Sequence, residues 1–272
     1  DSVERALAKA RIDGELGAKA GLLAERQRGG GHYDRLRGRV TFPIYDVRRR
    51  IVGFGGRALG ADQEPKYLNT PESPVFRKRE SFYGFPWALE HIRKHERAII
   101  CEGYFDRIAL HRAGLGEGLA TCGTALTREH ARSLRRRTET VVMLFDGDAA
   151  GAAAMERALE ALLPEGLRLR AAMLPDAMDP DDFLEARGAD ALRAVIDGAK
   201  DALELVMERA AAYDASSPAA KSEAVARVVP LLDDGPNPVE RHAYVRRLAL
   251  HMSWSEHEAL AELHDRSRRT ST

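Results

Sequence analysis

Apolar runs of four to eight residues alternate with longer helical segments through the middle of the chain. Strands are predicted at residues 98–101, 118–122, 140–145 and 167–174, with helices between them at 104–113, 127–137 and 149–163. Short apolar strands that alternate with helices are typical of a parallel sheet with both faces covered. Residues 97–200 are therefore expected to form a central α/β domain.

The segment before this domain has a different pattern. Residues 1 to about 27 are rich in Ala and Leu with helical spacing, and a run of three Gly follows them. The apolar runs Val40–Tyr45 and Ile51–Phe54 flank a polar turn, as in an antiparallel hairpin. The stretch Asp62–Pro74 is rich in turn-forming residues, so no regular structure is expected there. We predict an α+β subdomain at residues 1–96, in which this stretch is a loop facing a substrate.

After about residue 201 only helical patterns remain. Ser255 and Glu258 have the spacing of a capping box, in which two side chains satisfy backbone N–H groups at a helix start. A small helical bundle is predicted for residues 201–272. The expected fold class is thus mixed: an α+β subdomain, a central α/β domain with a parallel sheet, and a helical C-terminal part.

Composition limits the class of protein. The 272 residues are 44% hydrophobic, and only two of them are Cys. Cys101 and Cys122 both lie in apolar runs, which predicts buried, reduced thiols in a cytoplasmic protein. No apolar run reaches the roughly 20 residues that a membrane span requires, so no membrane association is expected. The chain starts at Asp1 rather than Met, and we expect it to be a piece of a longer protein.

Charge is balanced overall but unevenly distributed. The chain has 42 basic and 42 acidic residues, yet twelve Lys or Arg face only five Asp or Glu between Arg28 and Arg79. Ten of the 17 aromatic residues lie between Tyr33 and Trp87. Cations that contact phosphates and rings that stack on bases are typical of single-strand binding grooves. Most of these rings, Phe42 among them, are nevertheless expected to pack in the core.

Acidic residues follow the predicted strands of the central domain. Glu102 follows the first strand, Asp146 and Asp148 follow the third, and Asp179 and Asp181 come shortly after the fourth. The carboxyl ends of parallel strands share one crevice. There, each like-charge pair about 4 Å apart would cost on the order of 4 kcal/mol at an effective dielectric constant near 20. A hard cation removes this repulsion, and an all-oxygen ligand set favours Mg²⁺ or Mn²⁺.

These motifs resemble the Toprim domain of bacterial replicative primases. The resemblance is carried by Glu-Gly-Tyr-Phe-Asp at 102–106, Asp-Gly-Asp at 146–148 and Asp-Pro-Asp at 179–181. Four further segments, Arg39–Ile44, Gly53–Arg57, Pro65–Glu72 and Phe82–Gly84, are similar to the RNA polymerase core of the same family. The resemblance covers roughly residues 20–265.

The resemblance implies a nucleotidyltransferase that acts as a DNA primase in DNA replication. Such an enzyme synthesises short RNA primers from ribonucleoside triphosphates on a single-stranded DNA template, with two or more Mg²⁺ or Mn²⁺ ions, at the bacterial replication fork. The family's zinc-binding module and its helicase-binding domain are not recognised in this sequence. Zinc is therefore not expected, and the replicative helicase is expected as a partner only through the missing domain.

The resemblance also implies roles for individual residues. Glu102, Asp146 and Asp148 are the expected catalytic metal ligands, and Asp106, Asp179 and Asp181 are further candidates. The expected contacts to nucleic acid or nucleotide are Arg57, Lys66, Asn69 and Lys78, with Arg37 and Arg39 as additional candidates. Lys66 and Asn69 rank first because both fall in the stretch expected to be an irregular loop.

Several alternatives stay open at this point. Asp106 could only stabilise a helix N-terminus, Asp179 could be a helix N-cap, and Asp146–Asp148 is also typical of a turn. Glu102 could act as a general acid or base instead of a metal ligand. At the level of function, the alternatives are a Toprim-type metal-dependent nuclease and a non-catalytic module that binds single-stranded nucleic acid. A phosphatase of the haloacid dehalogenase type is disfavoured, because Glu102 has no role in that chemistry.

Overall fold

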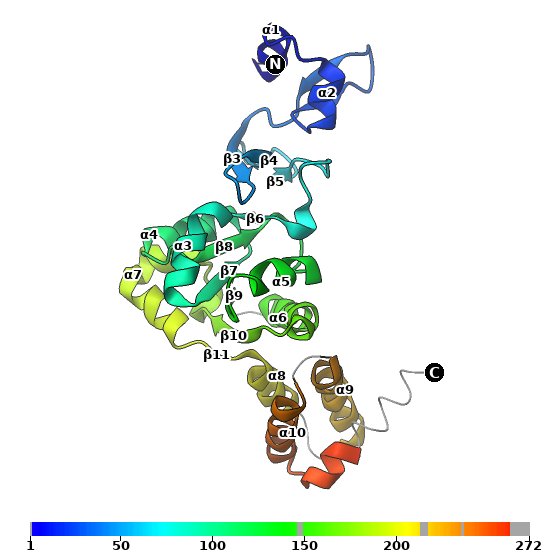
Figure 1. The fold of residues 1–272 in the computed structure, drawn as a ribbon, viewed down its shortest axis with the longest axis vertical. Helices are drawn as coiled ribbons and strands as arrows, with labels where there is room; N and C mark the ends of the chain where they lie inside the picture. Colours follow the sequence, from blue (N-terminus) through cyan, green and yellow to red (C-terminus); the bar gives the residue numbers. More distant parts are fainter. Residues whose placement is uncertain (1, 146–148, 213–216, 235–236, 262–272) are drawn as a thin grey trace.

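In the computed structural model of this protein, residues 2–145, 149–212, 217–234 and 237–261 are described. Figure 1 shows an elongated molecule, with the N-terminal helices at one end, the large sheet in the middle and a group of helices at the other end. No helix among the described residues has the length and apolar character needed to cross a membrane.

The N-terminal part combines two helices with a small hairpin. Helices α1 (Ser2–Lys9) and α2 (Gly14–Lys19) precede strands β1 (Leu23–Glu25) and β2 (His32–Asp34), which pair antiparallel. The prediction of helices up to residue 27 is therefore wrong for β1. Pairing with β2 buries Leu23, and this tertiary contact overrides the local helical preference.

A three-stranded antiparallel sheet follows. Strands β3 (Arg39–Tyr45) and β4 (Ile51–Ala58) form the predicted hairpin, and β5 (Tyr67–Asn69) pairs with the other edge of β4. The prediction that residues 62–74 lack regular structure is therefore wrong for β5. Its register places Asn69 opposite Gly55, a long-range pairing for which three residues carry no local signal.

The central sheet has six strands in the order β11-β10-β9-β7-β8-β6. The four inner strands are parallel, as predicted, while the two edge strands run antiparallel to their neighbours. The strands are β6 (Phe82–Tyr83), β7 (Arg97–Cys101), β8 (Gly118–Thr121), β9 (Thr140–Phe145), β10 (Arg168–Met173) and β11 (Lys200–Asp201). Because β6 belongs to this sheet, the sheet draws a strand from the segment before residue 97.

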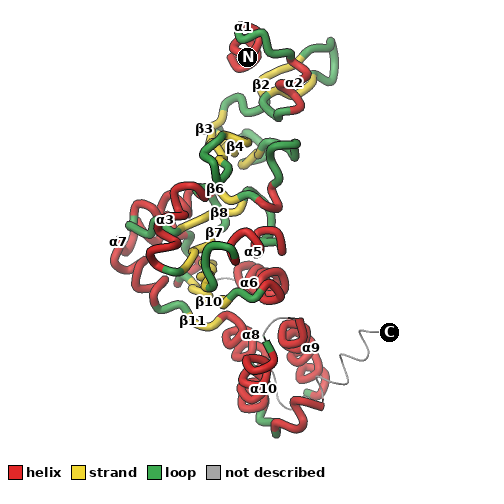
Figure 2. Tube along the Cα trace, in the orientation of Figure 1, coloured by secondary structure: helices red, strands yellow, loops and turns green. Residues whose placement is uncertain are grey.

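Helices cover both faces of the central sheet, as Figure 2 shows in red around the yellow strands. Ile100 and its neighbours on one face pack with α3, α5 and α6, whereas Ile99 and its neighbours on the other face pack with α4 and α7. The helices are α3 (Phe85–His95), α4 (Tyr104–Arg112), α5 (Arg128–Arg135), α6 (Ala149–Leu162) and α7 (Pro180–Asp197). Single 3-10 turns form η1 (Lys78–Glu80), η2 (Leu163–Glu165) and η3 (Pro175–Ala177). Both cysteines are free and buried, as predicted.

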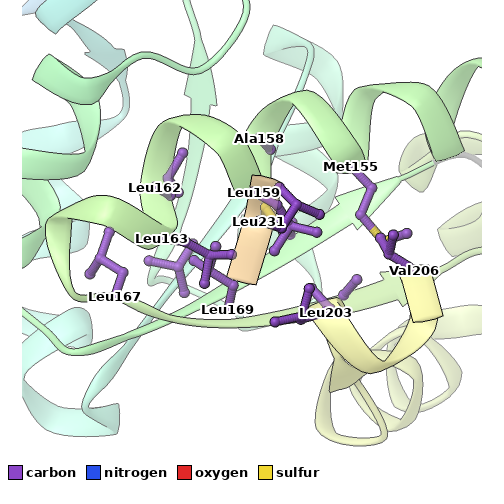
Figure 3. Close-up of a cluster of buried hydrophobic side chains, with 14 of the residues drawn as sticks. Met155, Ala158, Leu159, Leu162, Leu163, Leu167, Leu169, Leu203, Val206 and Leu231 are labelled. Carbon is purple, nitrogen blue, oxygen red and sulfur yellow. The ribbon is translucent and has the colours of Figure 1, made fainter. Parts of the chain in front are cut away.

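The C-terminal part is helical, as predicted. It contains α8 (Ala202–Ala211), α9 (Pro218–Asp234) and α10 (Pro238–Met252). Figure 3 shows how it joins the central domain: Leu203 and Val206 of α8 and Leu231 of α9 lie against Leu159 of α6 and Leu169 of β10. The predicted capping box is present, since the Ser255 N–H donates to Glu258 and the Glu258 N–H donates to Ser255.

Candidate active site

Two neighbouring strands bring the acidic motifs to one edge of the sheet. Strands β7 and β9 are adjacent and parallel, with Ile100 opposite Met143. Glu102 directly follows the end of β7, and its side chain is exposed. Phe145 ends β9, and Asp146 and Asp148, the predicted ligands after it, lie outside the described residues. Glu102 thus lies at the carboxyl ends of the parallel strands β7 and β9, where ligands bind in open α/β sheets.

Glu102 is available for binding. Within the described part of the chain its carboxylate makes no hydrogen bond and no ion pair. It lines a cavity of 360 Å³ at the ends of the inner strands, together with Thr121, Gly123, Phe145 and Arg157. A carboxylate that is not engaged by the protein is suited to coordinate a cation or to exchange a proton.

Asp106 has a structural contact. It is the third residue of α4, and its Oδ2 accepts a 2.7 Å hydrogen bond from the Gly103 N–H. A carboxylate at this position satisfies one of the free N–H groups at the helix start. The contact supports the helix-stabilising alternative and leaves one carboxylate oxygen outside this hydrogen bond.

Asp179 and Asp181 begin helix α7. Asp179 is the N-cap, as weighed from the sequence, and its Oδ1 accepts from the Asp182 N–H at 2.8 Å. Asp181 forms a 3.3 Å ion pair with Arg112 at the end of α4. These contacts fix the start of α7 beside α4.

Three of these acids affect the pKa of the Tyr67 phenol. Burial raises the pKa of the Tyr67 phenol, Arg57 lowers it, and the charges of Asp106, Asp179 and Asp181 raise it further. The charges of these three carboxylates therefore act on the same phenol of β5. The described residues contain no group of three or more His, Cys, Asp or Glu close enough to hold a metal ion.

Cations and rings of the small sheet face this acidic region. The Arg57 guanidinium lies 4.7 Å from the centre of the Phe105 ring and 6.0 Å from that of Tyr67. The Lys66 ammonium lies 6.0 Å from the centre of the Tyr67 ring, and its side chain is exposed. Arg57 and Lys66 therefore lie against aromatic rings, Tyr67 and Phe105, and Asp106 follows Phe105 directly in α4.

Asn69 has both ends of its amide engaged. Its Nδ2 donates to the Cys122 carbonyl at 2.7 Å, and its Oδ1 accepts from the Tyr104 hydroxyl at 2.8 Å. The expectation that Asn69 lies in an irregular loop is wrong, because it ends strand β5. Its side chain connects the three-stranded sheet to the central domain.

The remaining basic candidates have local contacts. The Arg37 guanidinium lies 4.4 Å from the centre of the Tyr33 ring, and Arg39 donates to the Lys66 carbonyl at 3.2 Å. The backbone N–H of Lys78 donates to Glu72. Within the described part of the chain, none of these three side chains pairs with an acidic candidate. Arg57 and Lys66 differ from these three in lying within about 6 Å of the Tyr67 ring, whose phenol feels the charges of three of the acids.

One residue that the sequence analysis did not single out helps to position the site. Tyr104 is buried, and its ring stacks on Phe42 with a centroid distance of 4.9 Å and an interplanar angle of 5°. Burial raises the pKa of its phenol, which is therefore a hydrogen-bond donor. The only signal in the sequence was its position between Glu102 and Asp106.

Three family models match successive parts of the chain. One described as "DNA primase catalytic core, N-terminal domain" matches residues 1–89, and a Toprim-like model matches residues 99–184. The DNA primase of Halalkalibacterium halodurans is 48% identical over 198 residues, which is 73% of this chain and 33% of that protein. A DNA primase domain from Pseudomonas aeruginosa has 39% identity and a TM-score of 0.82, covering 92% of this chain and 79% of that domain. This chain belongs to the bacterial DNA primase family.

Another solved primase fragment contains DNA. The RNA polymerase domain of Mycobacterium tuberculosis primase, in complex with a double-stranded DNA oligomer with a 6-nucleotide overhang, is 33% identical with a TM-score of 0.75. It covers 94% of this chain, and this chain covers 82% of it. The chain thus corresponds to the primase RNA polymerase domain and spans about a third of the length of the full-length primase from Halalkalibacterium.

The third family match corrects one expectation. A model described as "DnaB-helicase binding domain of primase" matches residues 206–257. The expectation that this chain has no helicase-binding segment is therefore wrong at the level of sequence similarity. The signal was missed because the helical pattern after residue 201 was assigned only to a bundle within the catalytic core.

Proposed function

We propose that this chain is the catalytic core of a primase, a DNA-dependent RNA polymerase that makes short RNA primers on single-stranded DNA at the bacterial replication fork. The observation that carries the proposal is the unengaged carboxylate of Glu102 at the end of β7, beside the strand that leads into Asp146 and Asp148. The cationic side chains of the small sheet face the same region.

The donor set fits a hard divalent cation. Glu102 offers free oxygens, Asp179 keeps one oxygen outside its N-cap bond, and the candidates include no thiolate or imidazole. We propose that Glu102, Asp146 and Asp148 hold Mg²⁺ or Mn²⁺, with Asp106, Asp179 and Asp181 around them. Such ions, when bound, neutralise the charges on phosphoryl oxygens during in-line displacement. The reaction is attack of a primer 3′-hydroxyl on the α-phosphorus of a ribonucleoside triphosphate, with release of pyrophosphate.

The protein's own side chains would orient the strands. Arg57 and Lys66 are exposed enough to contact phosphates, and Tyr67 and Phe105 place ring faces beside them. Asn69 and Tyr104 keep the small sheet at a set position against the metal-binding edge. The DNA complex of the related Mycobacterium tuberculosis domain supports nucleic acid as a ligand of this chain.

We further propose that the C-terminal helices contact the replicative helicase. The family match over residues 206–257 supports this partner. Helix α10 carries two exposed apolar side chains, Val239 and Leu250, with exposed Arg246 and Arg247 between them.

The test is template-dependent incorporation of a labelled ribonucleotide by the 272-residue chain, on single-stranded DNA with Mg²⁺ or Mn²⁺. The wild-type chain should give short RNA products, and Asp146→Asn should reduce them at least a hundredfold while single-strand binding stays within a few-fold of wild type. Glu160→Gln, an exposed carboxylate on α6, is the matched control and should synthesise normally. Metal-dependent cleavage of the template without synthesis would identify a nuclease instead, and binding without either reaction would identify a non-catalytic module.

A further inference from the structure

A second cavity is lined by residues of β3, β6, α3 and α4. It has a volume of 330 Å³, at the lower end of the range for small-ligand sites. Its lining includes Tyr45 of β3, Tyr83 of β6, Gly84 and Trp87 at the start of α3, and Arg107 and His111 of α4. None of the described residues that line it is acidic.

Arg107 is a buried cation without a partner. Its side chain is only 8% exposed, its Nε is buried without a hydrogen bond, and no carboxylate pairs with it in the described part of the chain. Burial lowers the pKa of the guanidinium, and the groups that oppose this shift are Tyr83 and Cys101. Burial of an unpaired charge is costly, so an arginine held in this way is suited to an anion that supplies the missing partner.

The backbone makes room for this guanidinium. Gly84 has a φ of 87°, and a Cβ atom there would lie 2.3 Å from the Arg107 Nε. Gly84 is also the N-cap of α3, which has 11 residues and no side-chain cap. Pro86 has no N–H group and the Trp87 N–H already donates to the Gly84 carbonyl, so the start of α3 contributes the positive end of its helix dipole to the cavity, and this favours an anion.

An aromatic surface borders the cavity. The rings of Tyr45 and Trp87 meet edge to face, with centroids 4.7 Å apart, and Trp87 is 45% exposed. The Tyr83 hydroxyl makes no hydrogen bond within the described residues. Burial raises the pKa of Tyr83, and the nearby Arg107 charge lowers it. An exposed indole beside a cation and a free hydroxyl can accept a planar ring that carries an anionic group.

We propose that this cavity is a second nucleotide-binding site, in which Arg107 and the start of α3 bind a phosphate and Trp87 stacks on the base. The inference goes beyond the proposed primase reaction, because none of these residues belongs to the metal-binding set. The nucleotide is either free in solution or part of a single strand, and the two sources present the same chemistry to the cavity.

Isothermal titration calorimetry in EDTA tests the site without any contribution from metal-dependent catalysis. The probes are adenosine 5′-monophosphate and, separately, a ten-nucleotide oligothymidylate without a terminal phosphate. The variants are Arg107→Met and Tyr83→Phe, and Arg93→Met on the exposed side of α3 is the matched control. Thermal unfolding should show that Arg107→Met folds at least as stably as wild type, because it removes a buried unpaired charge.

The expected result is binding of at least one probe by wild type and Arg93→Met, a loss of affinity of at least tenfold in Arg107→Met, and a smaller loss in Tyr83→Phe. Binding of the monophosphate identifies a free nucleotide, whereas Arg107-dependent binding of the oligonucleotide alone identifies a strand. Quenching of Trp87 fluorescence in a Trp254→Phe background should follow the same titration. No binding of the monophosphate together with equal affinity of Arg107→Met and wild type for the oligonucleotide would overturn the proposal and leave the primase assignment untouched.

Discussion

At the scale of single residues, Asn69 carries a contact that no local pattern reveals. Its one amide bonds a carbonyl and a hydroxyl of the central domain, although it belongs to the small sheet. The resemblance implied a nucleotide contact for Asn69, and the sequence analysis ranked it first because the turn-rich stretch around it was expected to be an irregular loop. The acidic residues were easier to locate, since each follows an apolar strand that is visible in the sequence.

Replacement of Asn69 should weaken the connection between the three-stranded sheet and the central domain. Asn69→Ala removes both hydrogen bonds and leaves the Cys122 carbonyl and the Tyr104 hydroxyl without partners. We expect the free energy of unfolding in urea to fall by about 1–3 kcal/mol. The control is Gln63→Ala, which removes one exposed hydrogen bond to the Arg37 carbonyl and should change stability by less than about 0.5 kcal/mol. A change of similar size in both variants would argue against the bridging role.

At the scale of elements, long and buried strands were predicted from the sequence, whereas short strands were missed. The four inner strands of the central sheet are buried on both faces, so their apolar runs predicted them within a residue or two. Strands β1, β5, β6 and β11 have two or three residues each and were missed. Their formation depends on partners that are far away in sequence, as β6 depends on β8, and no local pattern encodes that pairing.

Helix α5 is held against η1 and β6 by a buried histidine. His130 is fully buried, its Nδ1 lies 3.0 Å from the Thr127 hydroxyl, and its Nε2 lies 3.2 Å from the Ser81 carbonyl. Burial lowers the pKa of His130 below its usual 6.5, against the hydrogen bonds to the Ser81 and Lys78 backbone, which raise it. The folded protein therefore favours the neutral ring. The contribution of His130 to the free energy of unfolding is fully present above pH 6.5. It is lost as the pH falls below 6.5, because the unfolded chain binds the proton more readily than the folded one.

The lowered pKa of His130 predicts a dependence of stability on pH. Between pH 7 and pH 5 the free energy of unfolding should fall more steeply for the wild type than for His130→Gln. The difference between the two slopes should be at most about 1.4 kcal/mol per pH unit. The measurement is urea unfolding at several pH values. His242→Gln removes an exposed histidine and should keep the wild-type slope. Parallel curves for wild type and His130→Gln would show that His130 does not titrate as described.

At the scale of the whole molecule, the central sheet connects two flanking parts, the small sheet on one side and the C-terminal helices on the other. The small sheet supplies cations and rings, the central sheet supplies the acids, and the C-terminal helices join through the apolar cluster of Figure 3. The order of these parts was predictable from composition and periodicity, because each part has its own pattern. Their contacts were not, because they depend on single side chains such as Asn69 and Leu231.

The central claim is that the acids at the ends of β7 and β9 form one divalent-metal centre. Calorimetric titration of the chain with Mn²⁺ tests it most directly, with Glu102→Gln and Asp146→Asn as variants and Glu160→Gln as the control. Loss of one carboxylate ligand should weaken binding at least tenfold in both variants, even though the two residues are far apart in sequence. Wild-type affinity in Glu102→Gln, with binding lost only in Asp146→Asn, would contradict a shared centre.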